Sequence, residues 1–343
     1  MVGGFTYKVG IIGCGRIASE FEEEAWRQHP CTHAGAYSTI SQAKMVAACD
    51  TSKSKLEKFS KRWRVHKLYT DYRSMLSNEN LDIVSVCTHP ETHAQITIEA
   101  ARSGVKAIFC EKPMAGSIQE ARKMVEACEK RGVHLTVNHT RRWDLNYIEI
   151  RETLLKKELG EIEKINGSYT SGLFVIGTHM IDLLQYFAGN IVKVMGVKED
   201  TGGIKYRWYS ENYSPADPPV SGILWFKNGA IGQLLASCKT EYPFFDTETF
   251  TTRGRIITRE WDSMEYMMEI YRFKNGKAQK MSLEKKVTSR RNNLMVSAVE
   301  NVVSSLRKNR PTLSTGENAL QTMMVIEALT KSSKSGEPVR VGG

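Results

Sequence analysis

The sequence predicts an α/β protein that begins with a doubly wound parallel sheet and continues with an α+β domain whose open sheet is largely antiparallel. Up to residue 137, short apolar runs of strand type alternate with helical patterns. Beyond residue 138, three glycine-containing turns each join two extended runs, which is typical of β-hairpins. At 343 residues and 41% hydrophobic content, the chain is long enough for two cores. We therefore expect two domains, residues 1–137 and residues 138–343.

The first predicted strand leads into a glycine pattern. The apolar run that ends at Ile12 is typical of a buried parallel strand, and Gly13, Gly15 and Ala18 follow it directly. In such a pattern the first glycine permits a tight turn, the second lets a pyrophosphate approach the backbone, and the small third residue lets a helix lie close on the sheet. The alternative is a plain strand-turn-helix junction, but the position after an apolar strand favours dinucleotide binding. The residues expected to bind the cofactor here are Gly13, Gly15, Arg16 and Ile17.

The second predicted strand ends in an acidic residue. Asp50 follows the run Met45–Cys49, and its carboxylate would accept hydrogen bonds from the ribose hydroxyls of adenosine and repel a 2′-phosphate. This favours NAD over NADP. Asp50 lies 35 residues after Gly15, whereas about 20 is usual. We therefore interpret residues 20–38 as an insertion that lengthens the first helix, which is expected to begin after Ala18, or its loop.

The histidines and cysteines show no pattern of metal binding or disulfides. His29 and His33, within the insertion, lack a convincing ligand spacing and are expected to be structural or to face the substrate, so no metal site is predicted. The seven cysteines contain no Cys-x-x-Cys pair, and five of them lie in apolar patterns, as small buried side chains would. This usage indicates a reducing cytoplasm.

Charge and hydropathy argue against several classes of partner. The net charge of +10 is spread along the chain without a basic tail, which indicates a solvated surface rather than a nucleic-acid site. A lesser alternative is attraction of an anionic substrate such as a nucleotide sugar. No run of eighteen apolar residues would span a membrane, and the N-terminus lacks the apolar core of a signal peptide. We expect a cytoplasmic protein.

Two further groups of polar residues follow predicted strands. Ligands of parallel sheets bind outside the carboxyl ends of the strands, and two apolar runs end in Thr88–His93 and Glu111–Pro113. A lysine in such a place is usually a solvated surface residue. Here Pro113 fixes the backbone and favours an extended conformation at Lys112, which aims the side chain toward the nicotinamide end of the cofactor. The cofactor-binding residues expected at these strand ends are Thr88, Pro90, His93, Glu111 and Lys112.

The second half of the chain combines helices with hairpins. The hairpin turns are predicted at Asn228–Gly229, Arg253–Gly254 and Asn275–Gly276. Helical patterns cover residues 147–159, 177–188, 294–308 and 317–334, and the last has Ser314 and Glu317 as its expected cap. Residues 201–221, rich in proline and glycine, are expected to form a long loop that borders a cleft.

These motifs together resemble the Gfo/Idh/MocA family, named for glucose-fructose oxidoreductase, inositol dehydrogenase and a rhizopine-catabolism protein. A Glu-Lys-Pro triplet after a strand, with a His-x-x-Asp helix downstream, is the specific part of the resemblance. The resemblance spans nearly the whole chain. The motifs occur in the family's order: Gly13–Ala18, Asp50, Thr88–His93, Glu111–Pro113, Asn138–Trp143 and Gly177–Asp182.

The resemblance implies an N-terminal Rossmann domain and a C-terminal open-faced sheet, with the active site between them. It implies hydride transfer between nicotinamide C4 and a secondary alcohol or ketone carbon of a sugar, nucleotide sugar or cyclitol. It also implies a homodimer or homotetramer formed through the C-terminal sheet. The cofactor expected is NAD, with NADP the less favoured.

The resemblance also assigns roles to single residues. Lys112 would bind the reacting hydroxyl and aid its deprotonation, and His179 would be the general acid/base. Asp182, one turn later on the same helical face, would orient or contact the substrate. Arg141 and Arg142 would contribute to the substrate pocket or, as an alternative, form structural salt bridges.

Val175 departs from the family pattern, because many members carry an aspartate four residues before the catalytic histidine. Either Lys112 and His179 suffice for proton transfer, or the chemistry has shifted. Two alternatives to a dehydrogenase follow. One is an NAD-dependent glycosidase that oxidises C3 of its substrate transiently, and the other is a non-catalytic dinucleotide-binding sensor or subunit.

Overall fold

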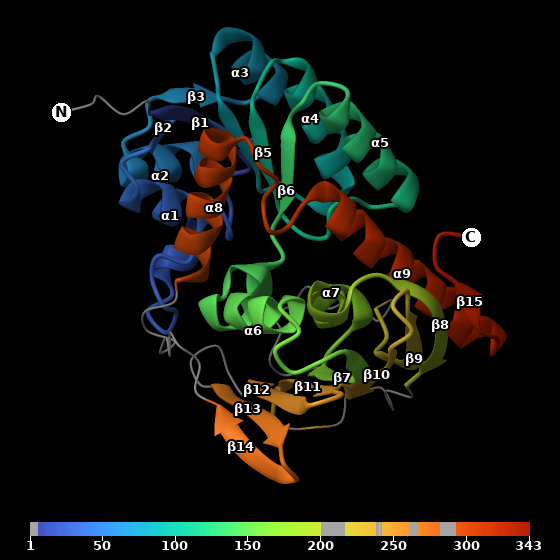
Figure 1. Cartoon of the computed structure of the whole chain (residues 1–343). Helices are drawn as coiled ribbons and strands as arrows, with labels where there is room; N and C mark the ends of the chain where they lie inside the picture. Colours follow the sequence, from blue (N-terminus) through green and yellow to red (C-terminus); the bar gives the residue numbers. More distant parts are fainter. Residues whose placement is uncertain (1–5, 200–216, 238–239, 241, 261–265, 282–292) are drawn as a thin grey trace. The chain divides into compact units, whose positions relative to one another are not determined.

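The computed structural model describes residues 6–199, 217–237, 240, 242–260, 266–281 and 293–343 (Figure 1). The chain folds into two compact units, Met1–Asp144 with Asn292–Leu320 and Leu145–Arg291 with Gln321–Gly343. A functional boundary at residue 137 stays a prediction, and most of the predicted loop at residues 201–221 lies outside the described residues. Among the helices described, none is both long and apolar enough to cross a membrane.

The first unit is built on a six-stranded parallel sheet, which confirms the predicted doubly wound sheet. Its strand order is β3-β2-β1-β4-β5-β6, and every pairing is parallel. In this order the two halves of the sheet meet between β1 and β4, at the switch point where dinucleotides bind. β4 and β5 are fully buried, which explains why they are apolar except for Ser85. The strands are β1 (Tyr7–Ile12), β2 (Ala43–Cys49), β3 (Lys67–Tyr69), β4 (Ile83–Val86), β5 (Ala107–Cys110) and β6 (His134–Val137).

Most helices of the first unit begin at side-chain caps. The side chains of Thr32, Ser52, Asp71 and Ser117 each accept a backbone N–H of the first helical turn. α8, from the predicted segment near the C-terminus, lies beside α1 (Figure 1) and shares its apolar core. These helices are α1 (His33–Thr39), α2 (Lys53–Trp63), α3 (Tyr72–Asn78), α4 (Pro90–Arg102), α5 (Ile118–Glu129) and α8 (Leu294–Lys308).

The prediction of a helix directly after Ala18 is wrong in one respect, because the insertion interrupts that helix. A single turn follows the glycines, closed by the Ser19 N–H donating to the Gly15 carbonyl (3.0 Å), and a 3-10 turn, η1 (Glu20–Glu23), comes next. α1 then continues that first turn after the insertion. The His33 N–H donates to the Ile17 carbonyl (3.1 Å), and the Ala34 N–H donates to the Ala18 carbonyl (3.0 Å). The insertion therefore loops out of the first helix, and it lengthens the loop rather than the helix.

The second unit is built on a nine-stranded sheet in the order β14-β13-β12-β11-β7-β10-β9-β8-β15. Only the β7–β10 pair among the paired strands described is parallel, so the largely antiparallel sheet is confirmed. The three predicted hairpins are β9–β10, β11–β12 and β13–β14. The strands are β7 (Ile162–Thr170), β8 (Ile191–Lys198), β9 (Val220–Phe226), β10 (Ile231–Ser237), β11 (Phe245–Thr251), β12 (Gly254–Glu260), β13 (Tyr266–Lys274), β14 (Lys277–Met281) and β15 (Val339–Arg340).

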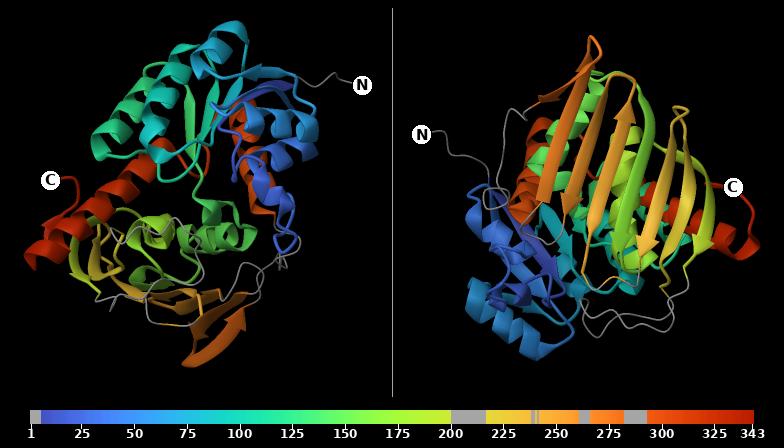
Figure 2. Two further views of the ribbon diagram at one scale, coloured as in Figure 1. Left: turned by 180° about the vertical axis from the view of Figure 1, so that it is seen from behind. Right: turned by 90° about the horizontal axis from the view of Figure 1, so that it is seen from below.

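Helices cover one face of this second sheet. α6 (Leu145–Leu155), α7 (Thr178–Ala188) and the later part of α9 (Gly316–Ser335) bury a core that includes Tyr169, Leu184 and Leu329. Figure 2 shows the strands in front of these helices when the sheet is viewed from below. The opposite face carries exposed aliphatic side chains on β8, β9 and β10.

The cap of α9 differs from the one expected. The Ser314 hydroxyl donates to the Val137 carbonyl (2.7 Å) and is therefore engaged by β6. Thr315 and Asn318 form the cap instead, since the Thr315 hydroxyl accepts the Asn318 N–H (3.3 Å) and the Asn318 side-chain oxygen accepts the Thr315 N–H (3.2 Å).

Candidate active site

The glycine turn after β1 has the geometry that a pyrophosphate site needs. Gly13 has a φ of +89°, and a Cβ there would lie 2.8 Å from the Cys87 carbonyl group, so the turn packs against the loop after β4 only with glycine. Gly15 faces open space, where the nearest atom to an added Cβ would be the Lys55 Nζ at 3.7 Å. Both glycines thus suit the phosphates of a dinucleotide. Gly13 permits the turn through its positive φ, and Gly15 leaves space for the phosphates.

Two other predicted cofactor residues flank this turn. Arg16 is exposed and pairs with Glu24 (3.4 Å), and its guanidinium lies 4.7 Å from the ring centroid of Phe21. Ile17 is partly buried against the core of the first unit. Lys55, on the exposed side of α2, was not predicted, although an ammonium group beside Gly15 would attract phosphate. Its only sequence signal is its place in the first turns of the helix after Asp50.

Asp50 is held firmly at the end of β2. Its Oδ2 accepts the Cys14 N–H and its Oδ1 accepts the Ser52 N–H, both at 2.8 Å. The carboxylate therefore links the glycine turn to the start of α2. Each oxygen still has a second lone pair, which a ribose hydroxyl can use.

The segment Thr88–His93 and the segment Glu111–Pro113 are tied together by one imidazole. Thr88 and Pro90 are partly exposed at the start of α4, whereas His93 is fully buried. The His93 Nδ1 lies 3.0 Å from the Pro113 carbonyl oxygen and its Nε2 3.0 Å from the Thr88 carbonyl oxygen. Burial lowers the pKa of His93, although these two carbonyls oppose the shift. His93 thus fixes the two loops to each other.

The Glu111 carboxylate is engaged by three neighbouring groups. Its Oε1 lies 2.9 Å from the His33 Nε2 and accepts the Asn138 side-chain N–H at 2.6 Å, while its Oε2 accepts the Lys112 backbone N–H at 3.2 Å. Burial favours a raised pKa of the Glu111 carboxyl, but the hydrogen bonds from His33 and Asn138 and the positive charge of Lys112 outweigh it and lower the pKa. Glu111 is therefore an ionised carboxylate that fixes the backbone of Lys112.

The predicted residues of the second unit lie on α7. His179 and Asp182 are both buried, and the Thr322 hydroxyl of α9 donates to the Asp182 Oδ1 at 3.4 Å. The turn before α7 is held by a carboxylate that the sequence did not single out. The Asp217 carboxylate accepts the N–H groups of Phe174 (2.8 Å) and Val175 (3.1 Å). It thus stabilises the start of the helix that carries His179.

Arg142 is buried in the first unit. Its Nη1 donates to the Leu313 carbonyl (2.8 Å) and to the Asn318 side-chain oxygen (3.2 Å). These contacts join the turn after β6 to Leu313 and to the first turn of α9, and a role of Arg142 in the substrate pocket stays a prediction.

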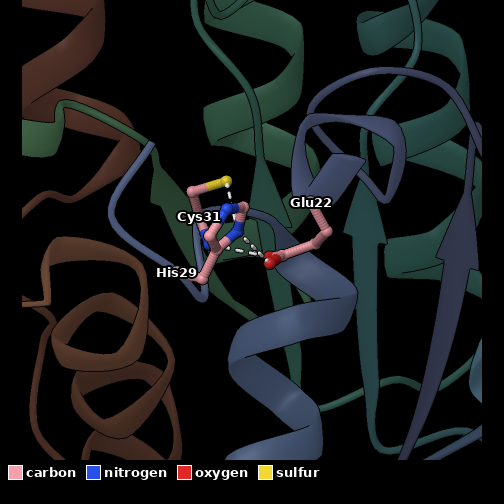
Figure 3. Close-up of side chains that lie close together, drawn as sticks. All are labelled: Glu22, His29 and Cys31. Atoms are coloured by element: carbon pink, nitrogen blue, oxygen red, sulfur yellow. Dashed lines mark hydrogen bonds and ion pairs between the residues drawn. The ribbon is translucent and has the colours of Figure 1, made fainter. Parts of the chain in front are cut away.

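Three possible metal ligands gather in the described part of the insertion, Glu22, His29 and Cys31 (Figure 3). The His29 Nδ1 lies 2.7 Å from the Glu22 Oε2, nearer than the separation of about 3.3 Å between two ligands of one tetrahedral zinc ion. The Glu22 Oε1 accepts both N–H groups of Cys31 and Thr32 and the Thr32 hydroxyl. Burial, with the Glu22 charge, raises the pKa of the Cys31 thiol to about 11. Through these hydrogen bonds Glu22 links the start of the loop to its end at Cys31 and Thr32.

A doubly wound sheet with an open glycine turn at its switch point defines a dinucleotide-binding protein. Residues 7–139 match the oxidoreductase family with an NAD-binding Rossmann fold, and residues 163–341 match the C-terminal alpha/beta domain of the same family. The chain belongs to the Gfo/Idh/MocA family of oxidoreductases, which confirms the resemblance in the motifs.

Individual relatives support the same assignment. The chain is 26% identical to the myo-inositol 2-dehydrogenase of Thermotoga maritima over 73% of this chain and 74% of that protein. It is 27% identical to the D-glucoside 3-dehydrogenase of Escherichia coli over 65% of this chain and 68% of that protein. An NAD-binding oxidoreductase from Klebsiella pneumoniae shares the fold, with a TM-score of 0.83 and 19% identity over 98% of this chain and 99% of that one.

Proposed function

We propose that this oxidoreductase is an NAD(H)-dependent dehydrogenase that transfers hydride between nicotinamide C4 and a secondary alcohol or ketone carbon. The proposed substrate class is a sugar, nucleotide sugar or cyclitol. The observation that carries this proposal is the fixed Glu111–Lys112 pair at the carboxyl end of β5, in the same unit as the open glycine turn. The ends of parallel strands are where ligands of such sheets bind.

The proposed cofactor residues fit NAD. When bound, NAD supplies the hydride acceptor of the reaction. Gly13, Gly15, Arg16 and Ile17 would hold the pyrophosphate, with Lys55 as an added positive charge. The Asp50 carboxylate, fixed by two backbone N–H groups, would accept from ribose hydroxyls and repel a 2′-phosphate, which favours NAD over NADP. Thr88, Pro90, His93 and Glu111 would line the remainder of the cofactor site.

The proposed chemistry of the protein itself is proton handling. Lys112 would bind the hydroxyl whose carbon gives up hydride, and His179 would accept the hydroxyl proton. Asp182 would orient the substrate from the same helix. Lys112 and His179 belong to different units, so their joint action on one substrate is inferred from the family assignment. The two relatives named above, which act on an inositol and on a glucoside by their names, support a cyclic polyol as substrate.

We also propose self-association through the face of the second sheet that lies opposite its helices. Val197, Ile223, Ile231 and Leu235 are 58%, 39%, 46% and 49% exposed, and they lie on the adjacent strands β8, β9 and β10. A cluster of aliphatic side chains on an open sheet is typical of an interface. The expected assembly is a homodimer or homotetramer.

A substrate panel tests the proposed activity. The purified protein is incubated with NAD and, one at a time, with inositols, aldoses, glucosides and nucleotide sugars, while NADH absorbance and glycoside cleavage are both followed. A dehydrogenase produces NADH with at least one compound. Release of the aglycone without net NADH would instead indicate the glycosidase, and cofactor binding without either product would indicate a sensor or subunit.

A further inference from the structure

His33 connects the insertion to the Glu-Lys-Pro segment. It is the first residue of α1, directly after the looped-out part of the insertion (residues 20–32), and its ring is fully buried with its centroid 4.4 Å from that of Phe109. Its Nε2 lies 2.9 Å from the Glu111 Oε1, and its Nδ1 lies 3.2 Å from the Ser85 hydroxyl on β4. Both ring nitrogens are therefore engaged by buried groups of the parallel sheet.

The hydrogen bond between His33 and Glu111 has a defined direction. An ionised carboxylate only accepts, so the His33 Nε2 must carry the hydrogen that it shares with Glu111. The Ser85 hydroxyl lies 3.2 Å from the His33 Nδ1 and 3.2 Å from the Tyr37 hydroxyl, so the chain continues through these two groups. Three buried side chains in series thus lead to the carboxylate next to Lys112.

The insertion in turn fixes where His33 lies. Glu22 holds the backbone N–H groups of Cys31 and Thr32, and the Thr32 hydroxyl accepts the Gly35 N–H at the start of α1. A Cβ at Gly35 would lie 2.2 Å from the Glu22 Oε1, so the helix accommodates this carboxylate only because residue 35 is glycine. The loop therefore has one defined position relative to the first turn of α1.

We propose that His33 is a positioning residue for Lys112: it holds the Glu111 carboxylate, and that carboxylate holds the backbone and sets the charge environment of the proposed catalytic lysine. This rests on the proposed function for the role of Lys112, but the contacts themselves lie within the first unit. In this assignment the insertion supports the active site, because it positions the His33 imidazole, which contacts Glu111 beside Lys112.

Three variants test this assignment. His33→Leu removes the donor to Glu111 and keeps an apolar side chain, His33→Gln restores an N–H donor, and Tyr37→Phe removes only the far end of the chain. We expect His33→Leu to lower kcat by about 10- to 100-fold, as for loss of one hydrogen bond to a charged group. His33→Gln and Tyr37→Phe should stay within about 3-fold of the parent. In all three, the Kd of NADH should change by less than about 3-fold, because the glycine turn and Asp50, which would hold the pyrophosphate and the ribose, are untouched.

A second measurement does not depend on activity. The Lys112 N–H donates to Glu111, so residue-resolved hydrogen exchange reports whether the carboxylate is still in place. Exchange at Lys112 should be at least about 10-fold faster in His33→Leu than in the parent and close to the parent in His33→Gln, with melting temperatures as the check on folding.

The outcomes separate this proposal from the proposed function. Unchanged exchange at Lys112 in a folded His33→Leu variant would overturn the positioning role, whatever the enzyme does. Faster exchange with unchanged kcat would show that the contact between His33 and Glu111 exists but does not serve turnover. This outcome would also overturn the positioning role. If the parent protein oxidises no polyol, the proposed function fails, and the exchange data alone then decide whether His33 positions Lys112.

Discussion

Lys112 is the single residue on which the proposed reaction depends most. Lys112→Ala should lower kcat by about 100- to 10,000-fold, the range for loss of a group that handles the reacting proton. The Kd of NADH should stay within about 3-fold, since the pyrophosphate and ribose are held elsewhere. Lys106→Ala is the matched control, because Lys106 lies just before β5, at its other end, in an exposed ion pair with Asp82 (2.7 Å). Equal turnover in both variants would remove Lys112 from the mechanism.

Asp50 should determine which dinucleotide is used. Asp50→Asn keeps the size of the side chain and removes the charge that would repel a 2′-phosphate. The ratio of kcat/KM for NADP to that for NAD should rise by at least about 10-fold, equal to about 1.4 kcal/mol. Steady-state kinetics with both cofactors measure this ratio. A parent enzyme that already prefers NADP would show that the ribose assignment is mistaken.

The glycine turn is the element whose two glycines act in different ways. Gly13→Ala forces a Cβ into the Cys87 carbonyl group at a positive φ and should destabilise folding by about 1–3 kcal/mol. Gly15→Ala meets only the end of the Lys55 side chain, so its melting temperature should stay near that of the parent while the Kd of NADH rises by at least about 10-fold. Thermal unfolding and fluorescence titration distinguish the two. A stable Gly13→Ala variant with normal NADH affinity would contradict the described turn.

Turns, hairpins and strands that depend on a few neighbouring residues could be predicted from the sequence. The glycine turn, the three hairpins and the strand that leads to Glu111 each depend on a few neighbouring residues, and all are present as expected. Asp50 could be placed because a strand end limits where its side chain lies. The start of α1 could not be predicted, because it depends on backbone hydrogen bonds that close across the insertion.

Contacts between distant residues had no signal in the sequence. His33 meets Glu111 across 78 positions, and Asp217 meets Phe174 across 43; in both cases the pairing depends on which elements the fold brings together. Ser314 is likewise the predicted cap of α9, but its hydroxyl instead donates to the Val137 carbonyl of β6. The sequence therefore predicts turns and strand ends, which depend on neighbouring residues, better than the contacts between distant residues that hold them in place.

For the molecule as a whole, the sheet face opposite the helices predicts the state of assembly. Leu235→Glu places a charge within the aliphatic cluster and should shift the protein toward monomers, since burying an unpaired carboxylate is costly. Light scattering after size-exclusion chromatography measures the mass. Leu155→Glu is the matched control, because Leu155 is 62% exposed on α6 rather than on the sheet. A monomeric parent, or an unchanged mass in the Leu235 variant, would contradict assembly through this face.

Transfer of a labelled hydrogen tests the central claim most directly. A substrate found in the panel is prepared with deuterium on the carbon that carries the reacting hydroxyl, and the NADH formed is analysed by mass spectrometry and NMR. Direct hydride transfer predicts that every NADH carries one deuterium at C4, on a single face of the ring. NADH without deuterium, or bound cofactor that is never reduced by any cyclic polyol, would contradict the account.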